Sequence, residues 1–358
     1  MALDEALGLV ESFSPALVRL GARAAAGEGY EPASADLVAL AGIGVERRQI
    51  HRLVNAAGPQ VAEQLKQNPN TDSQTSPILY VEADATGVPM VAKELAGCQG
   101  KQPDGSAKSR EVKLGCVFTQ TRTDPETGLP VRDLDSTTNR LLKKSFSSRK
   151  SCKNTNDFEG RFFKTCLFQQ PANVGGFESA AEFGLCFRNE AGRRGLGRAA
   201  KVVFLGDGAA WIWELARIHF PLAILTVDLD RLLERLHQLC PELYAGQPSW
   251  AKRMEDQWKA LLHQDRVADV IAAARRWLWD LGSQPDDTLE KEIAYFEHQQ
   301  SRMPYQTYRK QGLFYGSGII EAGCEVVIGQ RLKESGVFWT QSGATSILAM
   351  RCALKSNR

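Results

Sequence analysis

Apolar residues form short strand-like segments in the middle of the chain and recur at helical spacing towards both ends. The segments 78–86 and 111–123 alternate between apolar and polar residues, whereas 202–205 and 222–227 are short continuous apolar runs. Helical periods separate the later segments, at 178–192 and 209–219. Strands that first pair in a meander and then alternate with helices predict an α/β fold, a mixed sheet with flanking helices.

The first 67 residues are predicted to be helical throughout. Ser14 followed by Pro15 marks a helix start, and 34–40, a Gly-containing turn and 45–54 have the spacing of a helix-turn-helix. Four basic residues crowd the second of these helices: Arg47, Arg48, His51 and Arg52. They indicate either a DNA-binding face or the solvated basic face of an ordinary helical hairpin, and the segment alone leaves both readings open.

The remaining chain divides by composition. The polar, Pro-containing stretch 68–77 is predicted to be a linker between the helical domain 1–67 and a core beginning at 78. The core runs over 78–230, is interrupted by an all-helical insertion at 231–305, and resumes over 306–358. Within its first part, 139–173 carries eight Lys or Arg residues against two acids and is predicted to be an irregular basic insertion, either solvated or in contact with phosphates.

Composition excludes several classes of protein. The 358 residues are 43% hydrophobic and 24% charged, with a formal net charge of +2, so any nucleic-acid surface must come from local clustering. The eight cysteines contain no Cys-x-x-Cys pair, which argues against a zinc finger or a disulfide framework and favours the cytoplasm. Neither a signal peptide nor a long apolar run is present, so we expect no membrane partner.

Three acidic residues occupy positions that an apolar strand or a helix start would bring to one point. Asp84 follows the apolar residues of 78–83, Asp207 stands between two glycines after 202–205, and Glu321 lies in the first turn of the helix predicted at 319–334. Acids at the ends of buried strands are costly unless they are paired or bind cations. Hard divalent ions prefer such oxygens, so the three acids predict a two-ion Mg²⁺ or Mn²⁺ site for phosphoryl transfer.

The third acid has a rival. Glu325 lies four residues after Glu321, so both would share a face of an α-helix and either could reach the metal ions. Glu321 is favoured because it is nearer the Gly-Ser-Gly loop, where the helix dipole stabilises a negative charge and Ser317 is expected to cap the helix. For each acid taken singly, a helix cap or a surface ion pair is the competing reading.

Four further stretches form recognisable motifs: Asp84-Ala-Thr-Gly-Val-Pro-Met, Arg110-Glu-Val-Lys-Leu-Gly-Cys-Val-Phe-Thr-Gln-Thr, Leu205-Gly-Asp-Gly-Ala-Ala-Trp-Ile-Trp, and Gly316-Ser-Gly-Ile-Ile-Glu-Ala-Gly-Cys with its continuation to Trp339. Together they resemble the DDE transposases of bacterial insertion sequences, specifically the Kra-type family. The resemblance covers most of the chain. It implies a ribonuclease H-like catalytic core, an N-terminal region that binds terminal inverted repeats, and Asp84, Asp207 and Glu321 as the metal-binding triad.

The resemblance also implies double-stranded DNA partners, the terminal inverted repeats and the target, in a nucleoid-associated bacterial protein that acts as a homo-oligomer on DNA. Arg331 and Lys333 would contact phosphates, or else form surface salt bridges. Among the departures from the family pattern, Leu229-Asp230-Arg231 stands where an aromatic residue and a histidine are usual, and Glu325 where a lysine is usual. These departures motivate an alternative, a catalytically impaired DNA-binding remnant or repressor of such an element. A structure-specific nuclease of the same superfamily is a further alternative.

Overall fold

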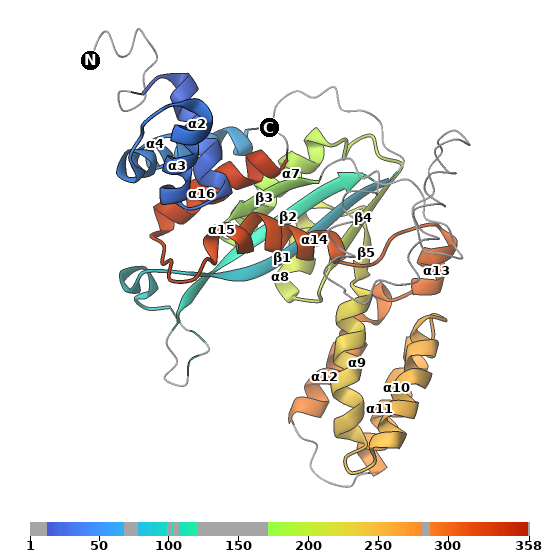
Figure 1. Cartoon of the computed structure of the whole chain (residues 1–358). Coiled ribbons are helices and arrows are strands. Elements are labelled where there is room, and N and C mark those ends of the chain that lie inside the picture. Colours follow the sequence, from blue (N-terminus) through green and yellow to red (C-terminus); the bar gives the residue numbers. More distant parts are fainter. Residues whose placement is uncertain are drawn as a thin grey trace, which may run out of the picture.

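The computed structural model describes residues 13–67, 78–98, 100, 102, 107–119, 171–280 and 287–356 (Figure 1). Its centre is a five-stranded sheet in the order β3-β2-β1-β4-β5. The strands are β1 (Ile78–Pro89), β2 (Ser109–Thr119), β3 (Ala172–Gly176), β4 (Lys201–Gly206) and β5 (Ile224–Val227). β1, β2 and β3 pair antiparallel, whereas β1, β4 and β5 run parallel. The predicted α/β fold with a mixed sheet is therefore confirmed.

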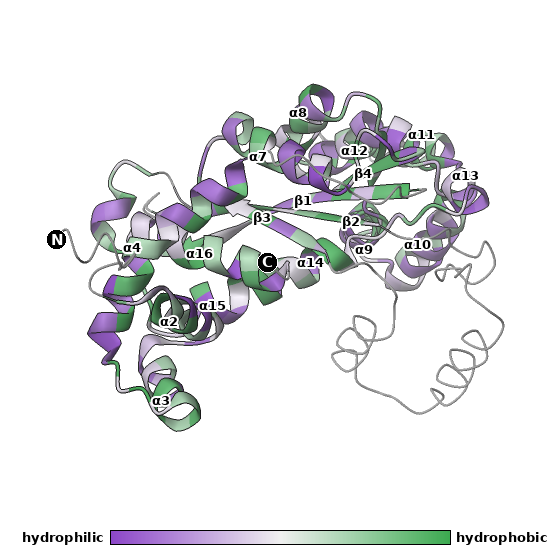
Figure 2. Ribbon diagram, turned by 90° about the horizontal axis from the view of Figure 1, so that it is seen from above, coloured by the Kyte–Doolittle hydropathy of each residue, from purple (hydrophilic) through white to green (hydrophobic). Residues whose placement is uncertain are grey.

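Helices cover both faces of this sheet (Figure 2). Helices α7 (Ala180–Arg193) and α8 (Ala210–His219) lie on one face, and α14 (Gly318–Gly323) and α16 (Gln341–Lys355) lie on the other. Alternate residues of β1 serve the two resulting cores: Leu79, Val81 and Ala83 pack towards α7 and α8, and Tyr80 packs on the opposite side. Because side chains alternate along a strand, Glu82 and Asp84 share the α14 side with Tyr80.

Three helices form the N-terminal part: α2 (Pro15–Gly27), α3 (Tyr30–Ala41) and α4 (Arg47–Lys66). As predicted, α2 begins at Pro15 with Ser14 as its N-cap, and a left-handed Gly42 ends α3. These helices share the main hydrophobic core, since α4 packs on α16 in close contact. A Cβ added at Gly58 of α4 would lie 2.2 Å from the Ser346 Cβ. The predicted linker 68–77 lies outside the described residues.

The predicted helical insertion forms four helices that extend away from the sheet on the side opposite α2–α4 (Figure 1). They are α9 (Leu229–Leu243), α10 (Pro248–Leu262), α11 (Val267–Asp280) and α12 (Asp287–Gln299). The short helices η2 (Gln300–Arg302) and α13 (Tyr305–Lys310) lead back to the core. No helix among the described residues is long and apolar enough to cross a membrane.

Two predicted segments differ in detail from the structure. The helix predicted at 319–334 is α14, a π-helical stretch (Cys324–Gly329) and α15 (Gln330–Leu332). The buried Arg351 donates to two carbonyls of the π-helical stretch, those of Val326 and Val327. The segment 139–173 was predicted to be irregular, and its residues 139–170 lie outside the described part of the chain. For residues 172–173 the prediction is wrong, because they begin β3. The 3₁₀ helix η1 (Ala92–Leu95) follows β1.

Candidate active site

Three neighbouring parallel strands each carry an acidic residue at the end of the sheet where their parallel pairing stops: Asp84 lies within β1, two residues after its last pair with β4, and Asp207 and Asp228 directly follow β4 and β5. In the register of β1 and β4, Glu82 pairs with Leu205, so two residues further on Asp84 comes beside Asp207. In the register of β4 and β5, Gly206 pairs with Val227, which places Asp207 beside Asp228. The strand directions therefore bring three aspartates to one edge of the sheet, two of them those predicted as metal ligands.

Asp84 is half-buried between like charges. Its Oδ1 accepts a hydrogen bond from the Ala85 N–H at 2.7 Å. Burial raises the pKa of Asp84, and the carboxylates of Asp207 and Glu321 raise it further, whereas the Arg231 guanidinium lowers it. The three predicted acids are thus close enough to act on each other electrostatically. Asp207 is fixed in a similar way, since its Oδ1 accepts from the Ala209 N–H at 2.9 Å.

Glu321 reaches this edge from α14, where Ser317 links it to Asp228. The Ser317 hydroxyl lies 2.7 Å from Asp228 Oδ2 and 3.0 Å from Glu321 Oε1. Ser317 stands at the N-cap position of α14, but its side chain makes no capping hydrogen bond, so that part of the prediction is wrong. The hydroxyl instead lies within hydrogen-bonding distance of both carboxylates and can donate its one hydrogen to either of them.

Two further acids of this site, Glu82 and Asp228, are buried. Glu82 is completely buried, and its Oε2 accepts from the Ile320 N–H in the first turn of α14 at 2.8 Å. Asp228, also completely buried, caps α9 through the N–H groups of Asp230 and Arg231. Burial raises the pKa of both carboxyls. Their role is positional: Glu82 ties β1 to α14, and Asp228 ties β5 to α9 and Ser317.

Arg231 is the one cation that enters this acidic edge from α9. Its Nη2 lies 3.8 Å from Glu321 Oε1, and its Nη1 bonds Glu234 at 2.9 Å. The hydrogen bond and charge of Glu234 raise the pKa of Arg231, with smaller contributions from Glu321 and Asp84. Both Arg231 and Glu321 are 43% exposed, so this ion pair is weak and exchangeable.

The donor set matches hard divalent cations in chemistry. Asp84, Asp207 and Glu321 offer only carboxylate oxygens, which Mg²⁺ and Mn²⁺ prefer, and a cation would relieve the repulsion that raises the pKa of Asp84. As the side chains stand, no group of three or more His, Cys, Asp or Glu among the described residues is close enough to hold an ion. A metal ion held by all three acids would need these side chains to lie closer together than they do here.

Glu325 lies apart from this edge. A Cβ added at Gly329 would lie 2.6 Å from Glu325 Oε2, so this carboxylate lies over the next turn of the helix. Glu321 instead contacts Ser317 and Arg231. The prediction that Glu321 and Glu325 share one helix face assumed a continuous α-helix. A π-helical stretch begins at Cys324, between the two acids, so this assumption does not hold. The geometry favours Glu321 as the third acid.

The predicted DNA-contacting residues occupy different environments. Arg331 is 2% exposed and donates from Nε to the Ala25 carbonyl at 3.0 Å, so its guanidinium is not available to a phosphate. Lys333 is exposed, and its Nζ donates to Thr86 Oγ1 at 2.5 Å, two residues from Asp84. Arg47, Arg48 and Arg52 are exposed on α4, and Arg47 forms a surface pair with Glu31 at 3.5 Å.

Sequence reasoning missed the supporting residues of this site. Asp228 directly follows an apolar strand, as Asp207 does, so the same rule could have identified it. Glu82 had a signal too, because a carboxylate inside a continuous apolar run is costly and needs a partner. The Ser317 link had none, because the loop before α14 gives no sign of what it contacts.

Comparison with known proteins assigns no family. No protein-family model matches the chain, and no curated protein matches it. The functional conclusion therefore depends on the residues and contacts of the carboxylate edge.

Proposed function

We propose that the protein is a DDE-type DNA transposase, which cleaves and joins DNA at the terminal inverted repeats of an insertion sequence in a metal-dependent reaction. One observation carries the proposal: Asp84 of β1, two residues beyond the last pair of β1 with β4, comes beside Asp207 at the carboxyl end of β4, and Glu321 arrives from a helix on the Asp84 side of the sheet. The order of the acids along the chain agrees with the resemblance of the motifs.

The arrangement of elements supports a ribonuclease H-like core. The first acid is on the central strand β1, the second follows β4, and the four-helix insertion separates both from the third. The exposed basic residues of α4 and Lys333 beside Thr86 are available to DNA phosphates. We propose that they hold the duplex while the carboxylate edge faces the scissile bond.

Asp84, Asp207 and Glu321 would hold the two divalent ions, which supply Lewis acidity and a nucleophilic oxygen when bound. The protein itself contributes position. Backbone N–H groups of Ala85 and Ala209 fix one oxygen of each aspartate. The second oxygen of Asp84 accepts from the Cys324 thiol at 3.8 Å, a weak donor that a metal ion would displace. Ser317 directs Glu321 towards the same edge, and the buried Glu82 and Asp228 hold the elements that carry the acids.

A catalytically silent DNA-binding protein is the second candidate, and Arg231 is the observation that favours it. Its guanidinium pairs with Glu321 and acts on Asp84, so a protein cation already compensates part of the acidic edge. A repressor built on a transposase fold would need no more than this. The two candidates differ in one measurable property, which is metal-dependent cleavage.

The test uses the full chain and a plasmid that carries its coding sequence with the flanking DNA on both sides. We expect nicks at the ends of the element in Mg²⁺ or Mn²⁺, followed by joining to a second plasmid. Asp84→Asn and Asp207→Asn should abolish both steps. Asp256→Asn is the matched control, because Asp256 is exposed on α10 and pairs only at the surface with Lys252.

Each outcome separates the candidates. A folded wild-type protein that binds the flanking DNA but never cuts it would refute the catalytic proposal and support the silent DNA-binding protein. Cleavage without joining would identify a nuclease. Cleavage that survives in Asp84→Asn and Asp207→Asn would show that these acids are not the metal ligands.

A further inference from the structure

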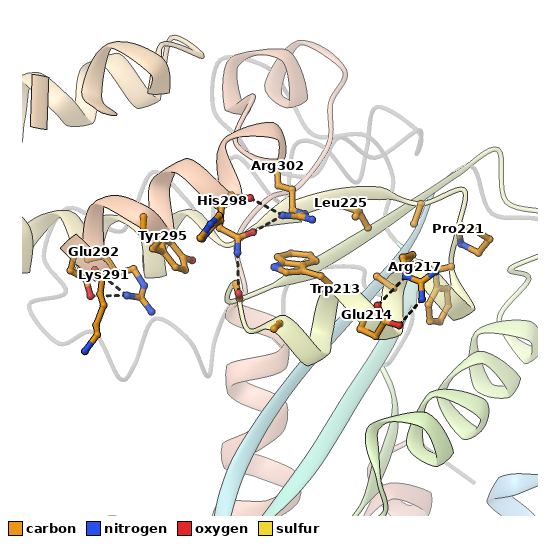
Figure 3. Close-up of a pocket in the computed structure, with 18 residues that line it drawn as sticks. Trp213, Glu214, Arg217, Pro221, Leu225, Lys291, Glu292, Tyr295, His298 and Arg302 are labelled. Carbon is orange, nitrogen blue, oxygen red and sulfur yellow. Dashed lines mark hydrogen bonds and ion pairs between the residues drawn. The ribbon is translucent and has the colours of Figure 1, made fainter. Parts of the chain in front are cut away.

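A large cavity lies between α8 of the core and α12 of the helical insertion (Figure 3). Its volume is about 1070 Å³, which is large enough for a nucleotide. Gly208, which immediately follows the catalytic candidate Asp207, is one of the residues that line it. The side chains that concern its chemistry are Trp213, Arg217, Lys291, Tyr295, His298 and Arg302.

Arg302 is a half-buried cation of this cavity that has no carboxylate partner among the described residues. Its guanidinium lies 4.7 Å from the centre of the Trp213 ring, and only Nη1 donates, to the His298 carbonyl at 3.2 Å and to Gln299 Oε1 at 2.9 Å. Its Nε is buried without a hydrogen-bond partner in the described part of the chain. Neutral acceptors alone leave a buried positive charge poorly compensated, and burial lowers the pKa of Arg302.

The other charges of the cavity wall do not compensate Arg302. The two lining carboxylates each pair with another arginine, Glu214 with Arg217 at 2.6 Å and Glu292 with Arg235 at 2.9 Å. Lys291 adds a further cation to the wall. The cavity is therefore positive overall, and an anion is the complementary ligand.

The cavity is connected to the carboxylate edge through α12. Tyr295 donates its hydroxyl to the Asp207 carbonyl at 2.7 Å, and Gln299 donates to the Gly208 carbonyl at 3.0 Å. Gly208 has a φ of 101°, and a Cβ there would lie 2.5 Å from the Tyr295 ring. Arg302 bonds the same Gln299 side chain. A ligand at Arg302 thus contacts a residue that holds the backbone next to Asp207.

We propose that this cavity is a second nucleic-acid site, in which Arg302 binds a backbone phosphate of the DNA strand that reaches Asp207. The inference rests on the proposed function for the identity of the strand. A nucleotide of DNA fits better than a free phosphate ion, because the cavity is much larger than such an ion and Trp213 and Tyr295 give it apolar walls. Phosphate recognition by a planar guanidinium beside an aromatic ring is chemically apt.

The test measures DNA affinity of the full chain against salt concentration, without divalent metal. Each phosphate contact contributes about 0.9 to the slope of log affinity on log salt for duplex DNA, and about 0.7 for single strands. We expect Arg302→Gln to weaken DNA binding and to reduce the magnitude of this negative slope by the contribution of one phosphate contact. Arg302→Lys should keep the wild-type slope, because it keeps the charge. The size of the change shows which form of DNA occupies the cavity, and competition by inorganic phosphate at constant ionic strength tests a free anion.

Arg266→Gln is the matched control, because Arg266 is exposed, pairs with Asp269 and lies at the turn between α10 and α11. A folded Arg302→Gln protein with the wild-type slope would overturn the proposal, as would a slope lowered equally by Arg266→Gln or displacement by inorganic phosphate alone. A lowered slope in Arg302→Gln, in a protein that never cleaves DNA, would refute the transposase and leave the site standing. DNA cleavage by the wild-type protein together with a wild-type salt slope in Arg302→Gln would support the transposase and refute the second nucleic-acid site.

Discussion

Replacing Arg331 by Met should destabilise the fold while leaving DNA affinity unchanged. Arg331 is buried between the N-terminal helices and the core: its Nε bonds the Ala25 carbonyl near the end of α2, and its guanidinium lies against the rings of Tyr30 and Trp339 at 5.1 and 5.0 Å. The Ala25 carbonyl is one of the last four of its helix, which have no partner within the helix. Loss of Arg331 leaves this acceptor unpaired.

The expected cost follows from these contacts. A hydrogen bond from a charged donor contributes about 1.5–3 kcal/mol, and each cation–π contact contributes about 0.5–1 kcal/mol. Relief from burying a guanidinium offsets part of this sum, and burial does lower the pKa of Arg331. Met fills much of the same volume, so the net loss in the free energy of unfolding should be about 2–4 kcal/mol.

The assay is urea denaturation followed by circular dichroism, paired with DNA binding. Lys333→Met is the matched variant, because it also removes one cation but from an exposed position on the same segment. It should change stability by less than about 0.5 kcal/mol and weaken DNA binding. If Arg331→Met keeps wild-type stability and loses DNA affinity instead, then Arg331 is a phosphate contact and the reasoning from burial is refuted.

Three further predictions concern the carboxylate edge. Burial and like charges raise the pKa of Asp84, so between the ordinary and the raised pKa the folded protein binds more protons than the unfolded chain. Without metal, the stability of the fold should therefore fall as pH rises through that window. Thermal melts should show a weaker dependence of stability on pH in Asp84→Asn and in the presence of Mg²⁺. Arg231→Gln removes the cation that pairs with Glu321, so calorimetry should show Mn²⁺ binding that is tighter by about threefold to tenfold. An unchanged Mn²⁺ affinity would show that Arg231 does not compete with the metal. Tyr295→Phe removes the hydrogen bond to the Asp207 carbonyl; it should cost about 1 kcal/mol of stability and slow cleavage, and normal cleavage rates would refute a positioning role.

The sheet and two of its acids were predictable because they depend on local patterns. Alternating and continuous apolar runs identified four strands of the described five-stranded sheet, and β3 was missed because it overlaps the segment predicted as irregular. Asp84 and Asp207 were found because a carboxylate at the end of a buried strand is costly without a partner. These signals are contained in short stretches of chain.

Arg331 could not be placed by the same reasoning. Its partner Ala25 is 306 positions away in the sequence, and nothing near either residue indicates that they meet. A basic residue close to a catalytic helix is equally consistent with a phosphate contact and with a buried bridge. The π-helical stretch was not predicted either, and its carbonyls accept from Arg351 of α16, a contact that no local pattern indicates.

The helical insertion is attached at both ends to residues that position the acids. At its start, Asp228 caps α9 and binds Ser317, whose hydroxyl also contacts Glu321. At its end, α12 holds the Asp207 backbone through Tyr295. The insertion therefore cannot rotate relative to the sheet without changing the distance between the second and third acids. In the proposed reaction these acids hold metal ions together, so we expect the position of the insertion to affect metal binding, and DNA bound against α12 is the proposed partner that would fix this position.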